Sequence, residues 1–381
     1  MSFAFQIVAQ EKFSKARLGI IHTDHGVVET PAFMPVATQG TVKGLTPEEV
    51  AGAGYHLLCV NTYHLYLRPG HKLILEKGGL GKFMGWSGAL LSDSGGFQAY
   101  SLAKIRKIDR EGVTFQSHID GSAHLLTPEL SMLVQGALAT DIAMVLDECI
   151  SYPASEKEVL NSLELSRHWA ERSKVSARPG QAVFGIVQGG VYPSLRRKSL
   201  DETMALDFDG YALGGLAVGE PDKQREEIVA EFAPQLPAER PRYLMGVGYP
   251  QDILSAVACG IDLFDCVLPT RCGRNALLFT TQGPINIRNA CFREDDQPAD
   301  SSCSCPVCRK FSRAYLRHLF LAREMLAPRL ASLHNLYFYA DFFNAIRKAI
   351  GEGILGEFSK LFLERYRSSG EETAVEVDQR M

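Results

Sequence analysis

The sequence has few of the features that would place the protein in a membrane or outside the cell. Among its 381 residues, no apolar run approaches the roughly 18 residues that a membrane-spanning helix needs. The first residues, MSFAFQIVAQEKFSKAR, reach charged side chains too early for a secretory signal. There is no long low-complexity stretch. We therefore expect a cytoplasmic protein with no membrane partner.

The bulk composition is that of an ordinary globular protein. With 46% hydrophobic and 22% charged residues, the chain can build a large core. Its length fits about two or three domains, or a single α/β barrel with insertions. The formal net charge of −4 argues mildly against a nucleic-acid partner, although only as an average over the chain.

The nine cysteines are scattered except for one cluster, Cys303-x-Cys305-x2-Cys308. In a reducing cytosol, clustered thiols indicate a metal more often than disulfides. Tetrahedral zinc needs a fourth ligand, and the candidates are His318 and His334. We favour His334, because His318 would lie in the middle of a helix while His334 would open a new segment before an aromatic helix. A closed Cys3His set predicts one structural zinc ion per chain; unliganded thiols or a redox pair are the alternatives.

Short apolar, β-rich runs recur along the chain with helical patterns between them. The runs are 55–62, 89–96, 141–148, 182–190, 210–219, 242–248 and 261–269. Apolar runs that alternate with helices indicate parallel strands in βα units, and seven visible units favour an eight-stranded (β/α)8 TIM barrel. A doubly wound sheet is the alternative, but no G-x-G-x-x-G follows an early strand.

Most of these runs stop at polar or glycine residues. They end near Asp93, Asp147, Gln188, Gly214–Gly215, Gly246 and Asp265. The carboxyl ends of barrel strands meet on the face where barrel active sites lie. Three carboxylates there suggest acid–base or nucleophilic chemistry, and few histidines accompany them to support a catalytic metal. We expect His56 and His64, which flank the first run, to be structural.

Several long motifs resemble those of the tRNA-guanine transglycosylases, from about residue 5 to about residue 365. These motifs are TPAFMPVATQGTVKGLTPEEV (30–50), NTYHLYLRPG (61–70), LSDSGGFQAYS (91–101), GGLAVGE (214–220), RYLMGVG (242–248), FDCVLPTR (264–271) and the Cys3His set. The resemblance implies a (β/α)8 barrel with a zinc-binding subdomain inserted near its end. It also implies exchange of the wobble guanine, position 34 of a tRNA anticodon stem-loop, for a 7-deazaguanine base on the route to queuosine.

The resemblance also implies roles for individual residues. Asp265 would be the nucleophile that forms a covalent ribosyl–enzyme bond, and Asp93 the general base for the incoming base. The residues that would bind the base are Asp93, Ser94, Gly95, Gly96, Phe97, Asp147, Gln188, Gly215 and Leu216. Cys149 and Val218 match bacterial members, which use 7-aminomethyl-7-deazaguanine, and Glu220 is a candidate partner for its ammonium group.

A basic zone from Arg271 to Arg329 gives a candidate surface for RNA phosphates. By resemblance, the RNA-binding residues would be Gly246, Val247, Gly248, Tyr249, Pro250, Gln251, Asp252, Thr270, Arg271, Cys272, Gly273 and Arg274. Tyr249, Gln251 and Cys272 depart from the usual family residues. The family also implies a homodimer.

The expected organisation has four parts. They are the main barrel (1–285), a basic zinc-binding subdomain facing the tRNA (286–345), a closing helical segment (346–367) and a disordered tail (368–381). Three alternatives stay open: a non-catalytic accessory relative, an archaeal-type transglycosylase, and a barrel metallohydrolase that uses the metal directly.

Overall fold

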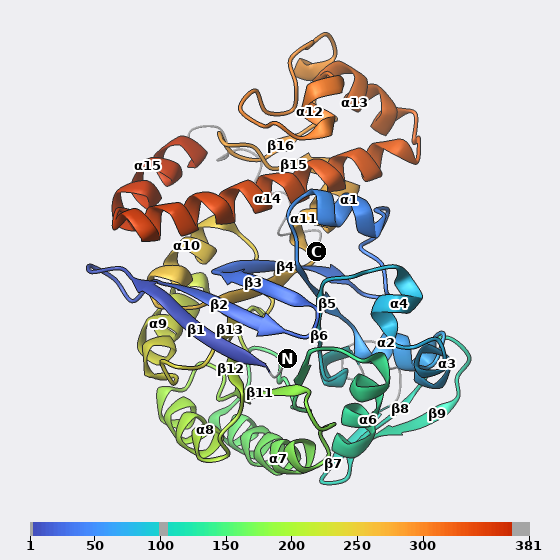
Figure 1. Ribbon diagram of the computed structural model, residues 1–381, viewed down its shortest axis with the longest axis vertical. Helices are drawn as coiled ribbons and strands as arrows, with labels where there is room; N and C mark the ends of the chain where they lie inside the picture. Colours follow the sequence, from blue (N-terminus) through green and yellow to red (C-terminus); the bar gives the residue numbers. More distant parts are fainter. Residues whose placement is uncertain (1–2, 99–105, 368–381) are drawn as a thin grey trace.

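A closed barrel of eight parallel strands forms the centre of the computed structural model, which describes residues 3–98 and 106–367 (Figure 1). In order around the barrel, the strands are β4 (Ala32–Ala37), β5 (Leu57–Val60), β6 (Ala89–Ser92), β10 (Ile142–Met144), β11 (Ala182–Val187), β12 (Gly210–Leu213), β13 (Arg242–Leu244) and β14 (Leu263–Cys266). Parallel pairing of β14 with β4 closes the barrel. The predicted barrel is confirmed, and the doubly wound alternative is wrong because the sheet closes.

Seven of the eight barrel strands lie in the seven apolar runs of the sequence. All four residues of β5, β6 and β12 are buried, as expected for strands covered on both faces. The eighth strand, β4, was not among the runs because Pro35 interrupts its short apolar segment. Pro35 pairs with Cys266 at the last position of β14.

Helices surround the barrel and complete its βα units. They are α1 (Pro47–Gly52), α2 (Thr62–Leu67), α3 (His71–Glu76), α4 (Leu80–Met84), α6 (Pro128–Leu138), α7 (Glu156–Val175), α8 (Pro193–Ala205), α9 (Asp222–Phe232), α10 (Pro250–Ala258) and α11 (Leu268–Arg274). Local sequence explains several helix starts. Ser155 and Glu158 form a capping box at α7, and Thr46 and Glu49 form another at α1.

Three small antiparallel sheets were not predicted. The first contains β1 (Ala4–Gln10), β2 (Arg17–Thr23) and β3 (Gly26–Thr30). The second, between β6 and β10 in sequence, contains β7 (Arg106–Asp109), β8 (Gly112–Gln116) and β9 (Ala123–Leu126), and the third pairs β15 (Leu277–Leu278) with β16 (Ile285–Asn286). The first sheet lies at the amino end of the barrel, because Arg17 and His25 bind Asp262 and Asp141, which precede barrel strands.

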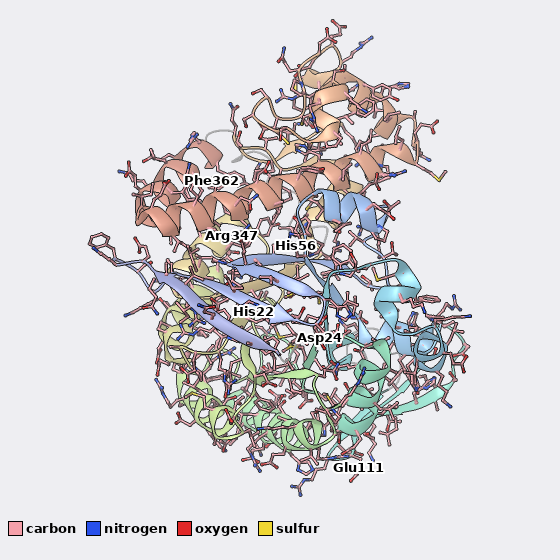
Figure 2. The ribbon with its side chains drawn as sticks, in the orientation of Figure 1. His22, Asp24, His56, Glu111, Arg347 and Phe362 are labelled. Carbon is pink, nitrogen blue, oxygen red and sulfur yellow. The ribbon has the colours of Figure 1, made fainter. Side chains whose placement is uncertain are left out.

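The C-terminal helices are α12 (Pro306–Lys310), α13 (Arg313–Leu321), α14 (Leu326–Glu352) and α15 (Leu355–Arg367). Helix α14 crosses the molecule between the barrel and the α12–α13 region (Figure 1). Arg347 of α14 points toward the first sheet (Figure 2), and its Nη1 donates to the Pro31 carbonyl at 2.8 Å. On the other side, Phe362 of α15 packs on Phe342 with ring centroids 4.7 Å apart.

The single helix α14 continues through residue 345, where the expected zinc-binding subdomain would end. The expected disordered tail, 368–381, lies outside the described residues. Within the described part of the chain, none of the helices combines the length and the apolar character required to cross a membrane.

A buried ion pair at the amino end of the barrel gives a test of this fold. Arg17 Nε donates to Asp262 Oδ1 at 2.9 Å, and the two side chains are 2% and 0% exposed. Removing one partner of a buried pair leaves an uncompensated charge and costs about 3–5 kcal/mol. We therefore expect Arg17→Met to lower the free energy of unfolding by about that amount, measured by urea denaturation.

The matched control is Arg172→Met, because Arg172 pairs with Glu129 nearer the surface, where the two side chains are 22% and 47% exposed. Exposed pairs contribute about 0–1 kcal/mol, so this variant should lose much less stability. Equal losses in the two variants would contradict the importance of the buried pair.

Candidate active site

Three carboxylates lie at the carboxyl ends of barrel strands. Asp93 follows β6, Asp147 follows β10, and Asp265 lies within β14. Ser94, next to Asp93, donates to Asp147 at 3.3 Å, and the charges of Asp265 and Asp147 both raise the pKa of Asp93. The structure therefore brings together the three carboxylates that the sequence predicted for one rim.

Asp93 is held by donors from the end of the neighbouring β5 and from its own loop after β6. Its Oδ1 accepts hydrogen bonds from the backbone N–H groups of Thr62 (2.9 Å) and Gly95 (3.1 Å), and the Asn61 side-chain amide donates to Oδ2. Burial raises the pKa of Asp93 to about 7; the charges of Asp265 and Asp147 add to the rise, and the two backbone donors oppose it. A carboxyl with this pKa can both give and take a proton near neutral pH.

Asp265 has a different arrangement, with two donors on one oxygen. The Tyr243 hydroxyl (2.6 Å) and the Gly246 N–H (2.9 Å) both donate to Oδ1. Burial raises the pKa of Asp265, and these two donors oppose the rise because they favour the charged form. Since both donors bind Oδ1, Oδ2 is left for another contact.

Asp147 is bound by two residues that were also predicted to contact the base. Gln188 Nε2 donates to Asp147 Oδ2 at 2.6 Å, and Ser94 Oγ donates to Oδ1 at 3.3 Å. Burial raises the pKa of Asp147 to about 6, against the effect of these two donors. The Gln188 amide and the Asp147 carboxylate thus bind each other in this structure.

Glycines let backbone segments approach these groups closely. A Cβ at Gly96 would lie 2.7 Å from the Asp147 carbonyl, and one at Gly215 would lie 2.3 Å from Gln188 Oε1. Gly95 and Gly215 have φ of +80° and +62°, which side chains rarely tolerate. Of the other predicted base-binding residues, Leu216 is buried, whereas the Phe97 side chain is 47% exposed and accessible for stacking.

The sequence did not reveal some of the residues that hold the carboxylates. Asn61 and Tyr243 lie inside quoted motifs, NTYHLYLRPG and RYLMGVG, but nothing in those motifs identified them as donors. His56 is exposed, and His64 is half-buried with Nδ1 unpartnered among the described residues. Glu220 accepts the N–H groups of Ala217 and Val218 through its side chain.

The predicted RNA-contacting segments adjoin Asp265, and their side chains divide into buried and accessible ones. The buried residues are Val247, Gly248, Pro250, Asp252, Thr270, Cys272 and Gly273. Asp252 pairs with Arg225 at 2.8 Å. The accessible or partly accessible residues are Gly246, Tyr249, Gln251, Arg271 and Arg274. Among the described residues, Arg274 Nη1 is buried without a hydrogen-bond partner.

Cys303, Cys305, Cys308 and His334 form a group that could hold a metal ion, with their ligand atoms within 4.8 Å of one another. His334 Nδ1 lies 3.3–3.9 Å from the three sulfurs, and Nε2 lies 2.8 Å from the Phe279 carbonyl. A hydrogen bond from Nε2–H to that carbonyl leaves Nδ1 free to bind metal. Three thiolates and one imidazole suit a closed tetrahedral zinc site.

The location of His334 corrects one detail of the sequence prediction. His334 does not open a new segment; it lies inside α14, which begins eight residues earlier at Leu326. The alternative ligand, His318, lies in α13 and outside the group. Among the described residues, no other cluster of His, Cys, Asp or Glu meets the same criterion, and no rim carboxylate belongs to this one.

Helix α14 links this cluster to the predicted RNA-contacting segments. Asn335 donates to the Pro269 carbonyl at 2.8 Å, and the Tyr339 hydroxyl donates to the Gly248 carbonyl at 2.6 Å. Gly273 allows α11 to pack against α14, because a Cβ there would lie 2.7 Å from the Ser332 nitrogen. The metal cluster and the segments beside Asp265 therefore belong to one packed unit.

Comparison with known proteins gives a consistent result. The family model of the queuine tRNA-ribosyltransferases matches residues 12–368. Proteins named queuine tRNA-ribosyltransferase from Caldanaerobacter subterraneus subsp. tengcongensis and Moorella thermoacetica are 51% and 52% identical over 370 and 365 residues. These alignments cover 97% and 96% of this chain and 99% and 98% of the relatives. A protein of the same name from Thermodesulfovibrio yellowstonii is 53% identical over 356 residues, or 93% of each chain.

The geometry of the metal cluster predicts how its ligands respond to substitution. We expect the purified protein to contain one zinc ion per chain and His334→Ala to bind it at least about a hundredfold more weakly, because even loss of a residue that supports a ligand costs 10–100-fold. Metal content by plasma mass spectrometry and a zinc-chelator titration would measure this. His318→Ala is the control and should keep its metal; equal metal affinity in both variants would exclude His334 as a ligand.

Proposed function

This chain belongs to the queuine tRNA-ribosyltransferase family and is a tRNA-guanine transglycosylase of the queuosine pathway; from that premise, we propose that it replaces the wobble guanine, position 34, with 7-aminomethyl-7-deazaguanine by double displacement. The observation that carries the proposal is the pair of rim carboxylates with different surroundings: Asp265 has both donors on one oxygen, and burial raises the pKa of Asp93 to about 7.

In the first half-reaction, Asp265 is the nucleophile. Its Oδ2 attacks C1′ of the nucleotide, and the bond between C1′ and N9 of guanine breaks. The bonding electron pair leaves with the guanine, which takes a proton from the protonated Asp93. Tyr243 and Gly246 hold the carboxylate of Asp265 so that the other oxygen faces the sugar. The product is a ribosyl ester of Asp265.

In the second half-reaction, Asp93 is the general base. It takes the N9 proton from the incoming base, whose N9 then attacks C1′ and displaces Asp265 as a carboxylate. Esterification of Asp265 removes one of the charges that raise the pKa of Asp93. The intermediate therefore favours the ionised form of Asp93, which is the form that a general base needs. Protons and electrons balance, since Asp93 gives one proton and recovers one.

The base would be bound between the strand ends. Asp147 can accept from the N–H groups on the guanine-like edge, while the Gly215 N–H and the Gln188 amide donate to O6. Because Gln188 and Asp147 bind each other at 2.6 Å, the base must rearrange this pair when it enters. Phe97 would stack on the ring, and Ser94, Gly95, Gly96 and Leu216 would line the pocket. The target nucleotide has to leave its stack to reach this site.

The tRNA anticodon stem-loop would lie over the accessible residues beside Asp265. Arg271 and Arg274 supply positive charge there, and Gly246, Tyr249 and Gln251 supply backbone and polar contacts. The buried residues of the same segments (Val247, Gly248, Pro250, Asp252, Thr270, Cys272 and Gly273) would shape that surface. A structural zinc ion on Cys303, Cys305, Cys308 and His334 would cross-link the chain next to it.

The four-part organisation remains a proposal: main barrel 1–285, zinc-binding subdomain 286–345, closing helices 346–367 and tail 368–381. Exposed apolar side chains on the metal-binding side, including Tyr315, Leu321 and Met325, support a homodimer. A tRNA substrate fits a cytoplasmic enzyme.

The identity of the nucleophile has a direct test. The wild-type protein should incorporate labelled 7-aminomethyl-7-deazaguanine into unmodified tRNA and form an RNA adduct that survives denaturation. Asp265→Asn should form no adduct and lose incorporation by on the order of 10⁴-fold, because an amide cannot replace the carboxylate nucleophile. Gel electrophoresis and label incorporation measure both results.

Asp201→Asn is the control, since Asp201 is exposed on α8 and belongs to neither the predicted base-binding nor the predicted RNA-binding residues. It should behave like the wild type. Incorporation by Asp265→Asn at the wild-type rate would move the nucleophile to another residue, and absence of incorporation by the wild type would reject the proposed reaction.

The two half-reactions should respond to pH in opposite directions. The first needs protonated Asp93, so kcat/KM for tRNA should fall as pH rises through about 7, where Asp93 loses its proton. The second needs ionised Asp93, so kcat/KM for the base should rise with pH as Asp93 of the intermediate loses its proton. Steady-state kinetics across this range would measure both. Parallel profiles would contradict the two roles of Asp93.

A further inference from the structure

Arg196 is a buried arginine that binds the loops at the ends of two neighbouring barrel strands. It lies in α8 and is 0% exposed. Its Nε donates to the Gly190 carbonyl at 2.8 Å and its Nη1 to the Val187 carbonyl at 3.2 Å. Its Nη2 donates to the carbonyls of Gly214 (2.9 Å) and Gly215 (3.3 Å). One side chain thus joins the end of β11 to the end of β12.

Backbone carbonyls, not a carboxylate, surround this cation. Within the described chain, no carboxylate forms an ion pair with Arg196, and Glu220 acts on it only at longer range. Burial lowers the pKa of Arg196 to about 10, so the group stays charged near neutral pH. Burying a cation in this way is costly, and the four carbonyl dipoles offset that cost.

One of these hydrogen bonds sets the direction of a base-binding donor. The Gly214 carbonyl and the Gly215 N–H belong to the same peptide unit, and in a trans peptide they point in opposite directions. Arg196 binds the carbonyl, so the N–H points away from it, toward the Cys149 thiol beside Asp147. Burial raises the pKa of that thiol to about 12, and the hydrogen bond from the Gly215 N–H opposes the rise.

We infer that Arg196 is a positioning residue for base departure: it fixes the peptide between Gly214 and Gly215 and polarises its N–H toward O6 of the leaving guanine. This inference rests on the proposed function. When the bond to C1′ breaks, the electron pair moves into the guanine ring and negative charge builds up on O6. A donor aimed at developing charge stabilises the transition state more than the neutral bound base.

The test compares Arg196→Lys and Arg196→Met with the wild type in exchange of labelled guanine into tRNA. Lysine keeps a cation but cannot reach all four carbonyls, and methionine keeps neither charge nor donors. Since loss of one transition-state donor costs about 10²–10³-fold in kcat, we expect kcat to fall about tenfold for lysine and about a hundredfold for methionine. KM for guanine should change less than about threefold, because O6 is neutral in the bound base.

Arg242→Lys and Arg242→Met are the matched controls. Arg242 is also a buried arginine that donates to backbone carbonyls, those of Pro234, Leu236 and Pro237, but it lies at the amino end of the barrel. Burial also lowers its pKa to about 10. These variants should lose stability without a change in kcat per folded molecule, measured by circular dichroism and kinetics.

The inference is overturned if the Arg196 variants raise KM for guanine by the same factor as they lower kcat. That result would indicate that the loop at Gly214 and Gly215 is disordered. It is also overturned when their kcat equals that of the Arg242 controls. The lysine variant tests it even when the methionine variant does not fold. Exchange by the wild type is measured in the same assay. Failure of the proposed function can therefore be told apart from failure of this inference, because it would appear as no exchange by any of the proteins.

Discussion

Burial of carboxylates at the carboxyl ends of the barrel strands is the constraint on which the site depends. A buried carboxylate needs hydrogen-bond donors, and the number and placement of those donors decide its chemistry. Asp265 has two donors on a single oxygen, which favour its charged form against the effect of burial and leave the other oxygen for a further contact. Asp93 has three donors, but burial beside two other carboxylates nevertheless raises its pKa to about 7. The two aspartates therefore suit different steps of the proposed reaction.

Helix α14 connects the rim, through its hydrogen bonds, to the metal cluster. His334, Asn335 and Tyr339 lie within two turns of the helix and contact three different segments: the cysteine cluster with Phe279, the start of α11, and the loop at Gly248. Gly246, in the same loop, donates to Asp265. A displacement of α14 would thus be felt at β14, so a metal bound by the cysteine cluster would support the rim without touching it.

The sequence predicted the features that depend on local pattern. Asp93, Asp147 and Asp265 were found because buried parallel strands appear as apolar runs and the rim begins where those runs stop. Strand β4 was missed because Pro35 breaks its pattern. Arg196, Asn61 and Tyr243 were missed for another reason: a donor is defined by what it reaches after folding, and Arg196 reaches carbonyls up to 19 positions away in the chain. The base-binding and RNA-binding assignments, by contrast, remain predictions.

The raised pKa values also bear on how an acidic protein can accept RNA at this rim. Three ionised carboxylates would repel the phosphates that must pass close to Asp265. With a pKa of about 7 for Asp93 and about 6 for Asp147, these carboxyls are partly protonated near neutral pH, and the rim carries less negative charge than its composition suggests. An approaching polyanion raises both values further, so each phosphate favours the neutral form of the groups that would repel it. The net charge of −4 is therefore a poor guide to nucleic-acid binding, because it counts as fully ionised some carboxyls that are partly protonated where the RNA would lie.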